Sequence, residues 1–459
     1  MDSVKNNEPT THCHVVAVPY PGRGHINPLM NLCKILASKK NDILVTFVVT
    51  EEWLGLISSE PKPENIRFCS VPNVVPSELG RAADHTSFFE ATMTKLEAPF
   101  EQLLYRLDPP ATVIVAETFL FWAVGVGNRR NIPVASFWPM SASVFMVFRH
   151  FNLLPQNSHF LLDVSVKGDE RVDYILGISS IRLVDLPKLR NHQMLHRILE
   201  AFTWVTKAQY LLFNSICELE SQAIDVLKAE LPMPIYIIGP TIPYFNLGEN
   251  SSVRGNHNDL NYLEWLDCQP RGSVLYIAMG SFLSVSSAQL DEIAVGLRNS
   301  DVRFMWVARG ETCRLKDVCG DMGLVVPWCD QLRVLSHSAI GGFWTHCGWN
   351  STQEGVFCGV PLLTFPIAVD QIQNSKLIVE DWKIGWRVKQ DVRGESLVTR
   401  EEIARLVQEF MNLESDEVKE MKKRASELQQ ICQQAIAEKG SSETDINAFI
   451  KDLSKCNGR

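Results

Sequence analysis

The first candidate for chemistry is a histidine that follows a short apolar run and a glycine-containing turn. Residues 15–21 (VVAVPYP) predict a buried strand, and the turn at 22–24 carries two glycines. Asn27 and Pro28 are typical of a helix start, so we expect the next helix to begin there. His25 is then expected at the carboxyl edge of the strand, where open α/β sheets bind ligands. An imidazole titrates near neutrality, so His25 is either a general base or a capping or buried histidine.

A carboxylate is expected near this histidine. Val113–Ala116 are four apolar residues that predict another strand, and Glu117 ends it. Because the carboxyl ends of parallel strands meet at one edge, Glu117 and His25 would share that edge. We interpret Glu117 as the group that orients His25, and a loop carboxylate that faces water is the alternative.

A second set of polar residues lies between Trp328 and Gln371. Asn350 and Ser351 follow a predicted strand and begin a helix, where they would present donors to an anion such as a diphosphate. Trp328 offers a flat aromatic face for a base, and Glu354, one turn further along the helix, could bind a ribose. Asp370 and Gln371 could bind sugar hydroxyls.

This segment resembles the signature box of plant family 1 UDP-glycosyltransferases. The resemblance rests on HCGWNST at 346–352, the following Glu354, the Gly-Val-Pro at 359–361 and the closing Asp-Gln. Outside the box the chain is similar to the same family at four further stretches, so the resemblance covers nearly its full length. They are PYPGRGHINP, WLDCQPRGSVLYIAMGS, the segment 290–297 and SSETDINAFI.

The resemblance implies a role for each residue of the donor site. Uracil would stack on Trp328, and the ribose would be bound by Gln331 and Glu354. The diphosphate would be bound by Ser281, His346, Asn350 and Ser351. The backbone N–H of Gly348 would assist them. Those implied for the sugar are Trp349, Asp370 and Gln371. A closing Gln is similar to what glucose users carry, so UDP-glucose is the expected co-substrate, with no other cofactor and no metal.

For catalysis, the resemblance implies an inverting transfer with His25 as the base and Glu117 as its orienter. The family usually carries Asp where this chain has Glu117, which adds one methylene to the carboxylate's reach. The alternative is therefore a glycosyltransferase-like binding protein with impaired turnover. The acceptor is expected to be a small apolar molecule with a hydroxyl or carboxyl group, near four aromatic residues that could equally be core. These are Phe119, Trp122, Trp138 and Phe145.

The elements that must position these residues belong to the α/β class. Short apolar runs alternate with helical patterns from end to end, which predicts repeated βαβ units. The predicted strands are 14–21, 43–50, 66–71, 112–118, 133–138, 211–216, 235–239, 273–279, 303–308, 324–327, 342–345 and 361–365. Together with the resemblance, this implies two Rossmann-like domains that face each other across a cleft (GT-B type). The N-terminal, acceptor-binding domain is expected at 1–240, a Gly/Asn/Ser-rich linker at 241–259 and the UDP-sugar domain at 260–440. The resemblance implies that a last helix, at 441–459, packs back on the N-terminal domain.

Composition excludes other classes of function. The net charge of −9 and the lack of a dense basic run argue against nucleic-acid binding. A polar N-terminus and the lack of a long apolar run predict a cytoplasmic protein without a membrane span, and nothing demands more than a monomer. His192 and His196 have the spacing of zinc ligands on a helix, but no third ligand is evident. The turn at 22–24 lacks a third glycine, which argues against an NAD- or flavin-dependent oxidoreductase.

Overall fold

The computed structural model describes residues 13–157, 159, 168–187, 192–244, 261–280, 285–389 and 397–455. Contacts divide the chain into two compact units. The first unit comprises Met1–Phe151, Arg190–Thr241 and Ile436–Arg459, and the second comprises Asn152–Leu189 and Ile242–Ala435. The predicted linker is described only as far as Tyr244.

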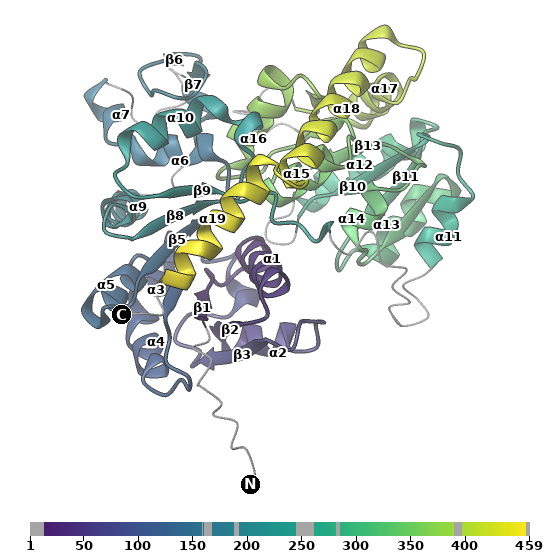
Figure 1. The fold of residues 1–459 in the computed structure, drawn as a ribbon. Coiled ribbons are helices and arrows are strands. Elements are labelled where there is room, and N and C mark those ends of the chain that lie inside the picture. Colours follow the sequence, from purple (N-terminus) through teal and green to yellow (C-terminus); the bar gives the residue numbers. More distant parts are fainter. Residues whose placement is uncertain are drawn as a thin grey trace. The chain divides into compact units, whose positions relative to one another are not determined.

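The first unit is built on a seven-stranded parallel sheet in the order β3-β2-β1-β4-β5-β8-β9 (Figure 1). Most of its strands are buried along their whole length, as expected of continuous apolar runs covered on both faces. The strands are β1 (Cys13–Val18), β2 (Ile43–Thr50), β3 (Ile66–Val71), β4 (Val113–Glu117), β5 (Val134–Trp138), β8 (Tyr210–Phe213) and β9 (Ile235–Ile237).

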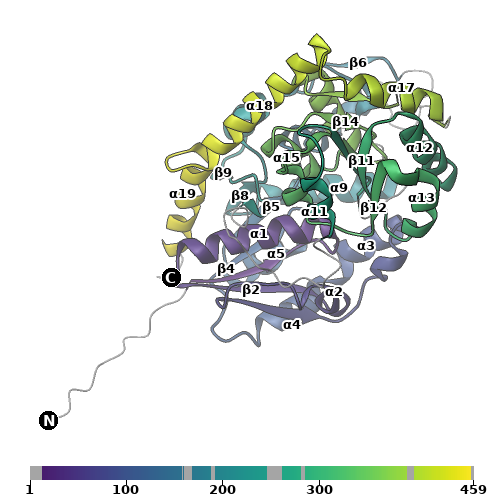
Figure 2. The same cartoon turned by 90° about the vertical axis from the view of Figure 1, so that its right-hand side faces the viewer.

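Helices connect these strands, as βαβ units require. They are α1 (Arg23–Lys39), α2 (Glu51–Ile57), α3 (His85–Lys95), α4 (Glu97–Leu104), α5 (Trp122–Arg130), α6 (Ala142–Arg149), α9 (His192–Val205) and α10 (Ser221–Glu230). The C-terminal helix α19 (Ser441–Lys455) also belongs to this unit, and Figures 1 and 2 show it beside β9. Asp445 accepts a hydrogen bond from the Ile237 N–H at 2.7 Å, and the Phe449 ring packs edge-on against Tyr210 at 5.9 Å.

The second unit contains a six-stranded parallel sheet in the order β12-β11-β10-β13-β14-β15. Numbered along the chain from β10, this order is 3-2-1-4-5-6, which is that of a Rossmann sheet. The first unit's sheet shares its 3-2-1-4-5 core, so the predicted α/β class with two Rossmann-like domains is confirmed. The strands are β10 (Val274–Ala278), β11 (Arg303–Val307), β12 (Gly323–Val326), β13 (Ile340–Thr345), β14 (Leu362–Thr364) and β15 (Gly385–Arg387).

The second unit also includes a segment from the first half of the sequence. There, β6 (Arg171–Val172) pairs antiparallel with β7 (Ile181–Arg182), and a 3₁₀ turn follows at Leu183–Asp185. Its helices are α7 (Leu153–Gln156), α11 (Asn261–Asp267), α12 (Ser287–Asn299), α13 (Thr312–Cys319), α14 (Gln331–Leu335), α15 (Trp349–Phe357), α16 (Gln371–Lys376), α17 (Arg400–Phe410) and α18 (Asp416–Ile436). One π-helical turn, Leu377–Asp381, follows α16.

Both sheets have a switch point, where the strand order reverses and the connections run to opposite sides. In the first sheet it lies between β1 and β4, and in the second between β10 and β13. Open α/β sheets bind ligands outside the carboxyl ends of the strands at such points. Within the described residues, no helix is long and apolar enough to cross a membrane.

Candidate active site

His25 lies in the first turn of α1, directly after β1. The expectation that this helix starts at Asn27 and Pro28 is wrong, because α1 begins at Arg23. The backbone N–H groups of His25 and Ile26 both donate to the Gly22 carbonyl at 2.9 Å and close the first turn earlier. Pro28 therefore lies inside the helix, where its missing N–H removes a single helical hydrogen bond. The His25 side chain is 24% exposed.

Glu117 is the last residue of β4, across the switch point from His25. Its side chain is fully buried, and its Oε1 lies 3.8 Å from His25 Nδ1. Among the described residues, neither Glu117 oxygen nor His25 Nδ1 has a hydrogen-bond partner. A distance of 3.8 Å is an ion-pair distance and too long for a hydrogen bond. Two buried polar atoms, Glu117 Oε1 and His25 Nδ1, thus face each other. If they approached by about 1 Å, they would form a hydrogen bond.

Aromatic side chains extend from His25 into the first unit. The Tyr20 ring lies 4.9 Å from the His25 ring and 6.4 Å from Phe89, and Phe89 packs edge-on against Phe119 at 5.8 Å. Trp122 lines a mainly apolar cavity at the carboxyl ends of β1 to β3, together with Trp53.

The other two aromatic residues expected near the acceptor lie deeper in the first unit. Trp138 and Phe145 are fully buried and pack edge-on at 5.2 Å. Phe202 covers both rings, at 5.7 Å and 4.7 Å, and Trp138 Nε1 donates to the Ser141 carbonyl at 2.8 Å. These two rings are part of the hydrophobic core of the first unit.

In the second unit, a hydrogen-bonded group joins the start of α14 to the first turns of α15. Gln331 Nε2 donates to Glu354 Oε2 at 2.7 Å and to Ser351 Oγ at 3.0 Å, and Tyr276 donates to Gln331 Oε1 at 3.2 Å. The Gln331 amide is therefore held from both ends. Burial raises the pKa of Glu354 to about 7. The nearby Trp328 is 53% exposed, which is unusual for so large an apolar side chain.

His346 follows β13 and lies between two glycines. A Cβ added to Gly280 would lie 2.6 Å from His346 Nε2, and one added to Gly348 would lie 2.5 Å from it. Only glycine permits this close approach on both sides. Burial lowers the pKa of His346 to about 4, so the imidazole is neutral at pH 7.

The helix α15 starts directly after this histidine. Gly348 is its N-cap, and no side chain caps it. The first N–H groups of a helix have no partner within the helix, and the helix dipole favours negative charge there. Trp349, Asn350 and Ser351 form this first turn, so the geometry suits an anion.

The last two predicted donor residues lie at the start of α16, where Asp370 is the N-cap and Gln371 the first helical residue. Gln371 Oε1 accepts hydrogen bonds from the backbone N–H groups of Ile367 and Ala368, at 2.8 Å and 3.0 Å. The side-chain NH₂ group of Gln371 is then oriented to donate to a ligand. Val369 has a φ of 53°, an unfavourable value for a β-branched residue. Asp370 Oδ2 accepts from Asn374 Nδ2 at 2.8 Å.

The structure brings nearly all the predicted donor residues to the carboxyl edge of the second sheet. Ser281 lies outside the described residues. Sequence reasoning missed Tyr276 and Asn374, which orient Gln331 and Asp370, because neither stands in a recognisable pattern. Within the described part of the chain, no three His, Cys, Asp or Glu residues are grouped as metal ligands, and His192 and His196 both lie in α9.

Comparisons with known proteins agree with this geometry. Residues 243–440 match the family model of UDP-glucuronosyl and UDP-glucosyl transferases. UDP-glycosyltransferase 87A1 of Arabidopsis thaliana is 52% identical over 95% of this chain and 100% of its own length, and 87A2 of the same plant is 50% identical over 98% of both chains. The structure of Phytolacca americana UGT2 with UDP-2-fluoro-glucose and pterostilbene superposes with a TM-score of 0.79 at 28% identity, covering 96% of this chain and 99% of that one. The chain therefore belongs to the UDP-glycosyltransferase family and is a glycosyltransferase.

Proposed function

We propose that the enzyme transfers glucose from UDP-glucose to a hydroxyl or carboxyl group of a small apolar plant metabolite, with inversion at the sugar carbon. The observation that carries the proposal is the convergence of donor-binding residues on the switch point of the second sheet. Exposed Trp328 and Gln331 follow β12, whereas His346 and Glu354 follow β13. The hydrogen bond from Gln331 to Glu354 joins these two segments. These residues match the base, the ribose and the diphosphate of one nucleotide.

His25 is the proposed general base. Its Nδ1 faces Glu117, which leaves Nε2 to take the proton from the acceptor hydroxyl. The acceptor oxygen forms a bond to sugar C1 as the bond from C1 to the UDP oxygen breaks, and that electron pair leaves with UDP. The carboxylate of Glu117 stabilises the imidazolium that results.

The departing diphosphate is stabilised by the first turn of α15 and by His346. A neutral His346 donates one N–H to a phosphate oxygen, and the helix start adds its backbone donors and dipole. With these donors present we propose that no metal ion takes part, so chelation by EDTA should leave turnover unchanged.

Glucose as the sugar is supported by Gln371. Its amide N–H groups are oriented by the two hydrogen bonds that its oxygen accepts, and they can donate to sugar hydroxyls. A closing Gln is similar to what glucose users of the family carry. The relative from Phytolacca americana was solved with UDP-2-fluoro-glucose.

The acceptor is proposed to lie against the aromatic surface of Tyr20, Phe89 and Phe119, next to His25. These three rings are buried and pack tilted or edge-on, at 6.4 Å and 5.8 Å, so the region next to His25 is apolar and aromatic. Pterostilbene, bound by the Phytolacca americana relative, is an apolar aromatic compound. The proposal is tested by UDP release from UDP-glucose, compared with UDP-galactose, over a panel of phenolic, terpenoid and carboxylic acceptors. Acceptor-dependent release that favours UDP-glucose supports it, and release only with another sugar nucleotide refutes the sugar assignment.

A second candidate is a binding protein of the same fold with impaired turnover. The separation of 3.8 Å between His25 and Glu117, and the Glu in place of the family's Asp, favour testing it. The variant Glu117→Asp decides between the two. A changed rate shows a working pair, an unchanged rate shows that Glu117 is a bystander, and no turnover in either protein despite UDP binding favours the binding protein.

A further inference from the structure

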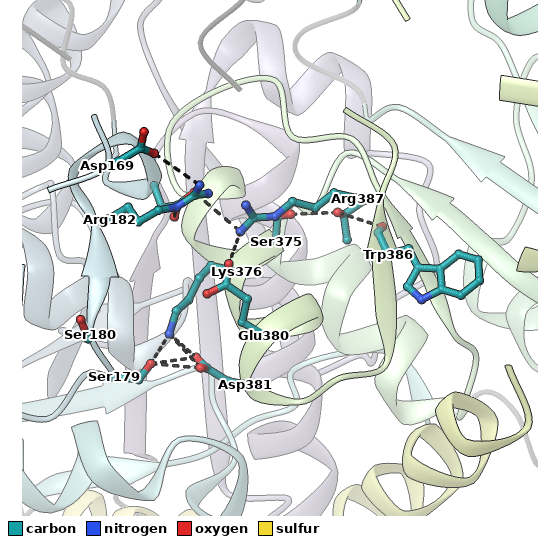
Figure 3. A network of polar contacts seen from close by, with 12 residues as sticks. Asp169, Ser179, Ser180, Arg182, Ser375, Lys376, Glu380, Asp381, Trp386 and Arg387 are labelled. Atoms are coloured by element: carbon teal, nitrogen blue, oxygen red, sulfur yellow. Dashed lines mark hydrogen bonds and ion pairs between the residues drawn. The ribbon is translucent and has the colours of Figure 1, made fainter. Parts of the chain in front are cut away.

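A polar network in the second unit joins the β6–β7 hairpin to the segment that contains α16 and β15 (Figure 3). The hairpin, residues 168–187, precedes the second sheet by about 90 residues in the sequence, yet it belongs to the same compact unit. Its backbone is closed by hydrogen bonds from Leu183 N–H to the Glu170 carbonyl and from Val184 N–H to the Gly168 carbonyl, both at 2.9 Å. The hairpin thus presents its side chains from a fixed frame.

The first part of the network surrounds Lys376, the last residue of α16. The Lys376 side chain is only 5% exposed, and its Nζ lies 2.8 Å and 2.9 Å from the two oxygens of Asp381. It also donates to Ser179 Oγ of the hairpin, and Ser179 donates in turn to Asp381 at 3.0 Å. Figure 3 shows the three groups closing a triangle between the hairpin and the end of α16.

The second part surrounds Asp185, whose side chain is 1% exposed. Arg182 contacts both oxygens of Asp185, at 2.7 Å and 2.9 Å. Arg387 of β15 lies 3.6 Å from Asp185 and 2.9 Å from Glu380. A buried carboxylate of the hairpin is therefore shared between its own arginine and an arginine of the second sheet's last strand.

The helix α16, which ends at Lys376, begins at the residues proposed to bind the sugar. Gln371 and Lys376 are the two ends of α16, about 7.5 Å apart along the helix. Asn374, in the middle, is fully buried and donates to Asp370 at 2.8 Å and to the Cys347 carbonyl at 3.0 Å. A displacement of Lys376 would therefore be transmitted to Asp370 and Gln371, because so short a helix moves as one body.

We propose that Ser179, Asp185, Lys376 and Arg387 are positioning residues for the donor sugar: the hairpin holds α16 so that Asp370 and Gln371 meet the sugar hydroxyls. The proposal rests on the proposed function, because it assigns a purpose to the sugar-binding end of α16. Ion pairs removed from water add little net stability, but they fix the geometry of the groups that make them. A network of this kind suits the placement of a helix to a fraction of an ångström.

The test compares sugar binding with nucleotide binding in Lys376→Met and Ser179→Ala. UDP contacts α14, α15 and Trp328 in the proposed site, so UDP affinity should stay within about twofold of wild type. Catalytic efficiency with UDP-glucose should fall by ~10- to 100-fold in Lys376→Met, because misplacement by 1 Å costs on that order. The fall should be smaller in Ser179→Ala, and Ser179→Thr, which keeps the hydroxyl, should restore it. Glu292→Gln, which removes the Arg400 ion pair of α12 in the same unit, is the matched control and should change neither quantity.

Hydrogen exchange provides a readout that needs no turnover. In wild type, UDP-glucose should protect the backbone amides of residues 367–376 beyond the protection given by UDP, and Lys376→Met should lose this difference. The proposal is overturned if the extra protection survives in Lys376→Met with unchanged efficiency. It is also overturned if UDP affinity and efficiency fall by the same factor, which is the sign of a general structural role. A wild-type enzyme that binds UDP-glucose without any acceptor-dependent turnover refutes the proposed function instead, while the exchange experiment still tests the network.

Discussion

Donor affinity should depend on pH through Glu354. Burial raises the pKa of this carboxyl to about 7, so about half of the molecules carry it protonated at pH 7. A ribose hydroxyl that donates to the carboxylate favours the charged form, so binding lowers the pKa and releases a proton. The sign is then fixed: affinity for UDP-glucose rises with pH and falls as Glu354 becomes protonated.

The magnitude follows from the pKa. The ionised fraction falls from about 0.9 at pH 8 to about 0.1 at pH 6, so the affinity should drop by about tenfold, or ~1.4 kcal/mol. His346 does not contribute over this window, because its pKa lies at about 4. Asp330 raises the Glu354 pKa by its negative charge, so Asp330→Asn should shift the midpoint to lower pH.

Calorimetric titration with UDP-glucose at constant ionic strength measures this effect. UDP-glucose is the proper ligand, because its diphosphate is esterified at both ends and lacks the second phosphate ionisation near pH 6 that free UDP has. In Glu354→Gln the affinity should be lower at pH 8 and nearly constant across the range. A wild-type affinity that is flat, or that rises on acidification, would refute the reasoning, as would a Glu354→Gln protein that keeps the tenfold dependence.

Three substitutions test the remaining features of the site. Gly348→Ala leaves the backbone unstrained, with φ at −59°, but its methyl group would displace the His346 ring by about 1 Å, so turnover with UDP-glucose should fall by ~100-fold. Trp328→Ala should weaken UDP binding by about 1–3 kcal/mol through lost stacking, with the unfolding midpoint unchanged because the side chain is exposed. Trp138→Ala should lower the free energy of unfolding of the first unit by about 3–5 kcal/mol in denaturant titration, because this ring is core. A Trp138→Ala protein of normal stability whose acceptor KM alone is raised would instead make Trp138 an acceptor contact.

Most of the fold could be predicted because its strands are continuous apolar runs. Every strand of the first sheet, and all but one of the second, falls on a run identified from the sequence. The missed strand, β15, has three residues, Gly-Trp-Arg, and carries no apolar period. Its place is set by pairing with β14 and by the contact of Arg387 with Asp185, which lies far away in the sequence. The β6–β7 hairpin was missed for the same reason, since each strand has two residues.

The site was predictable where one element supplies both the residue and its direction. Placing His25 and Glu117 after two neighbouring parallel strands was enough to predict that they would meet. Residues that orient a site residue from another element were not predictable. The hydrogen bond from Tyr276 to Gln331, for example, depends on packing between a strand and a helix, and its two residues lie 55 positions apart in the sequence. The sequence could not show that the four aromatic residues Phe119, Trp122, Trp138 and Phe145 are all buried. Nor could it show that Phe202 of α9 packs against Trp138 and Phe145, because that contact joins distant segments.

The proposed chemistry is tested most directly by acceptor-dependent UDP release from UDP-glucose in wild type and in His25→Ala, each with its UDP affinity measured. His25 belongs to the first unit and the nucleotide site to the second, so UDP affinity should be the same in both proteins. Loss of a general base predicts a fall in turnover of about 10²- to 10⁴-fold. Turnover in His25→Ala that stays within a few-fold of wild type would contradict the assignment of His25 as the base.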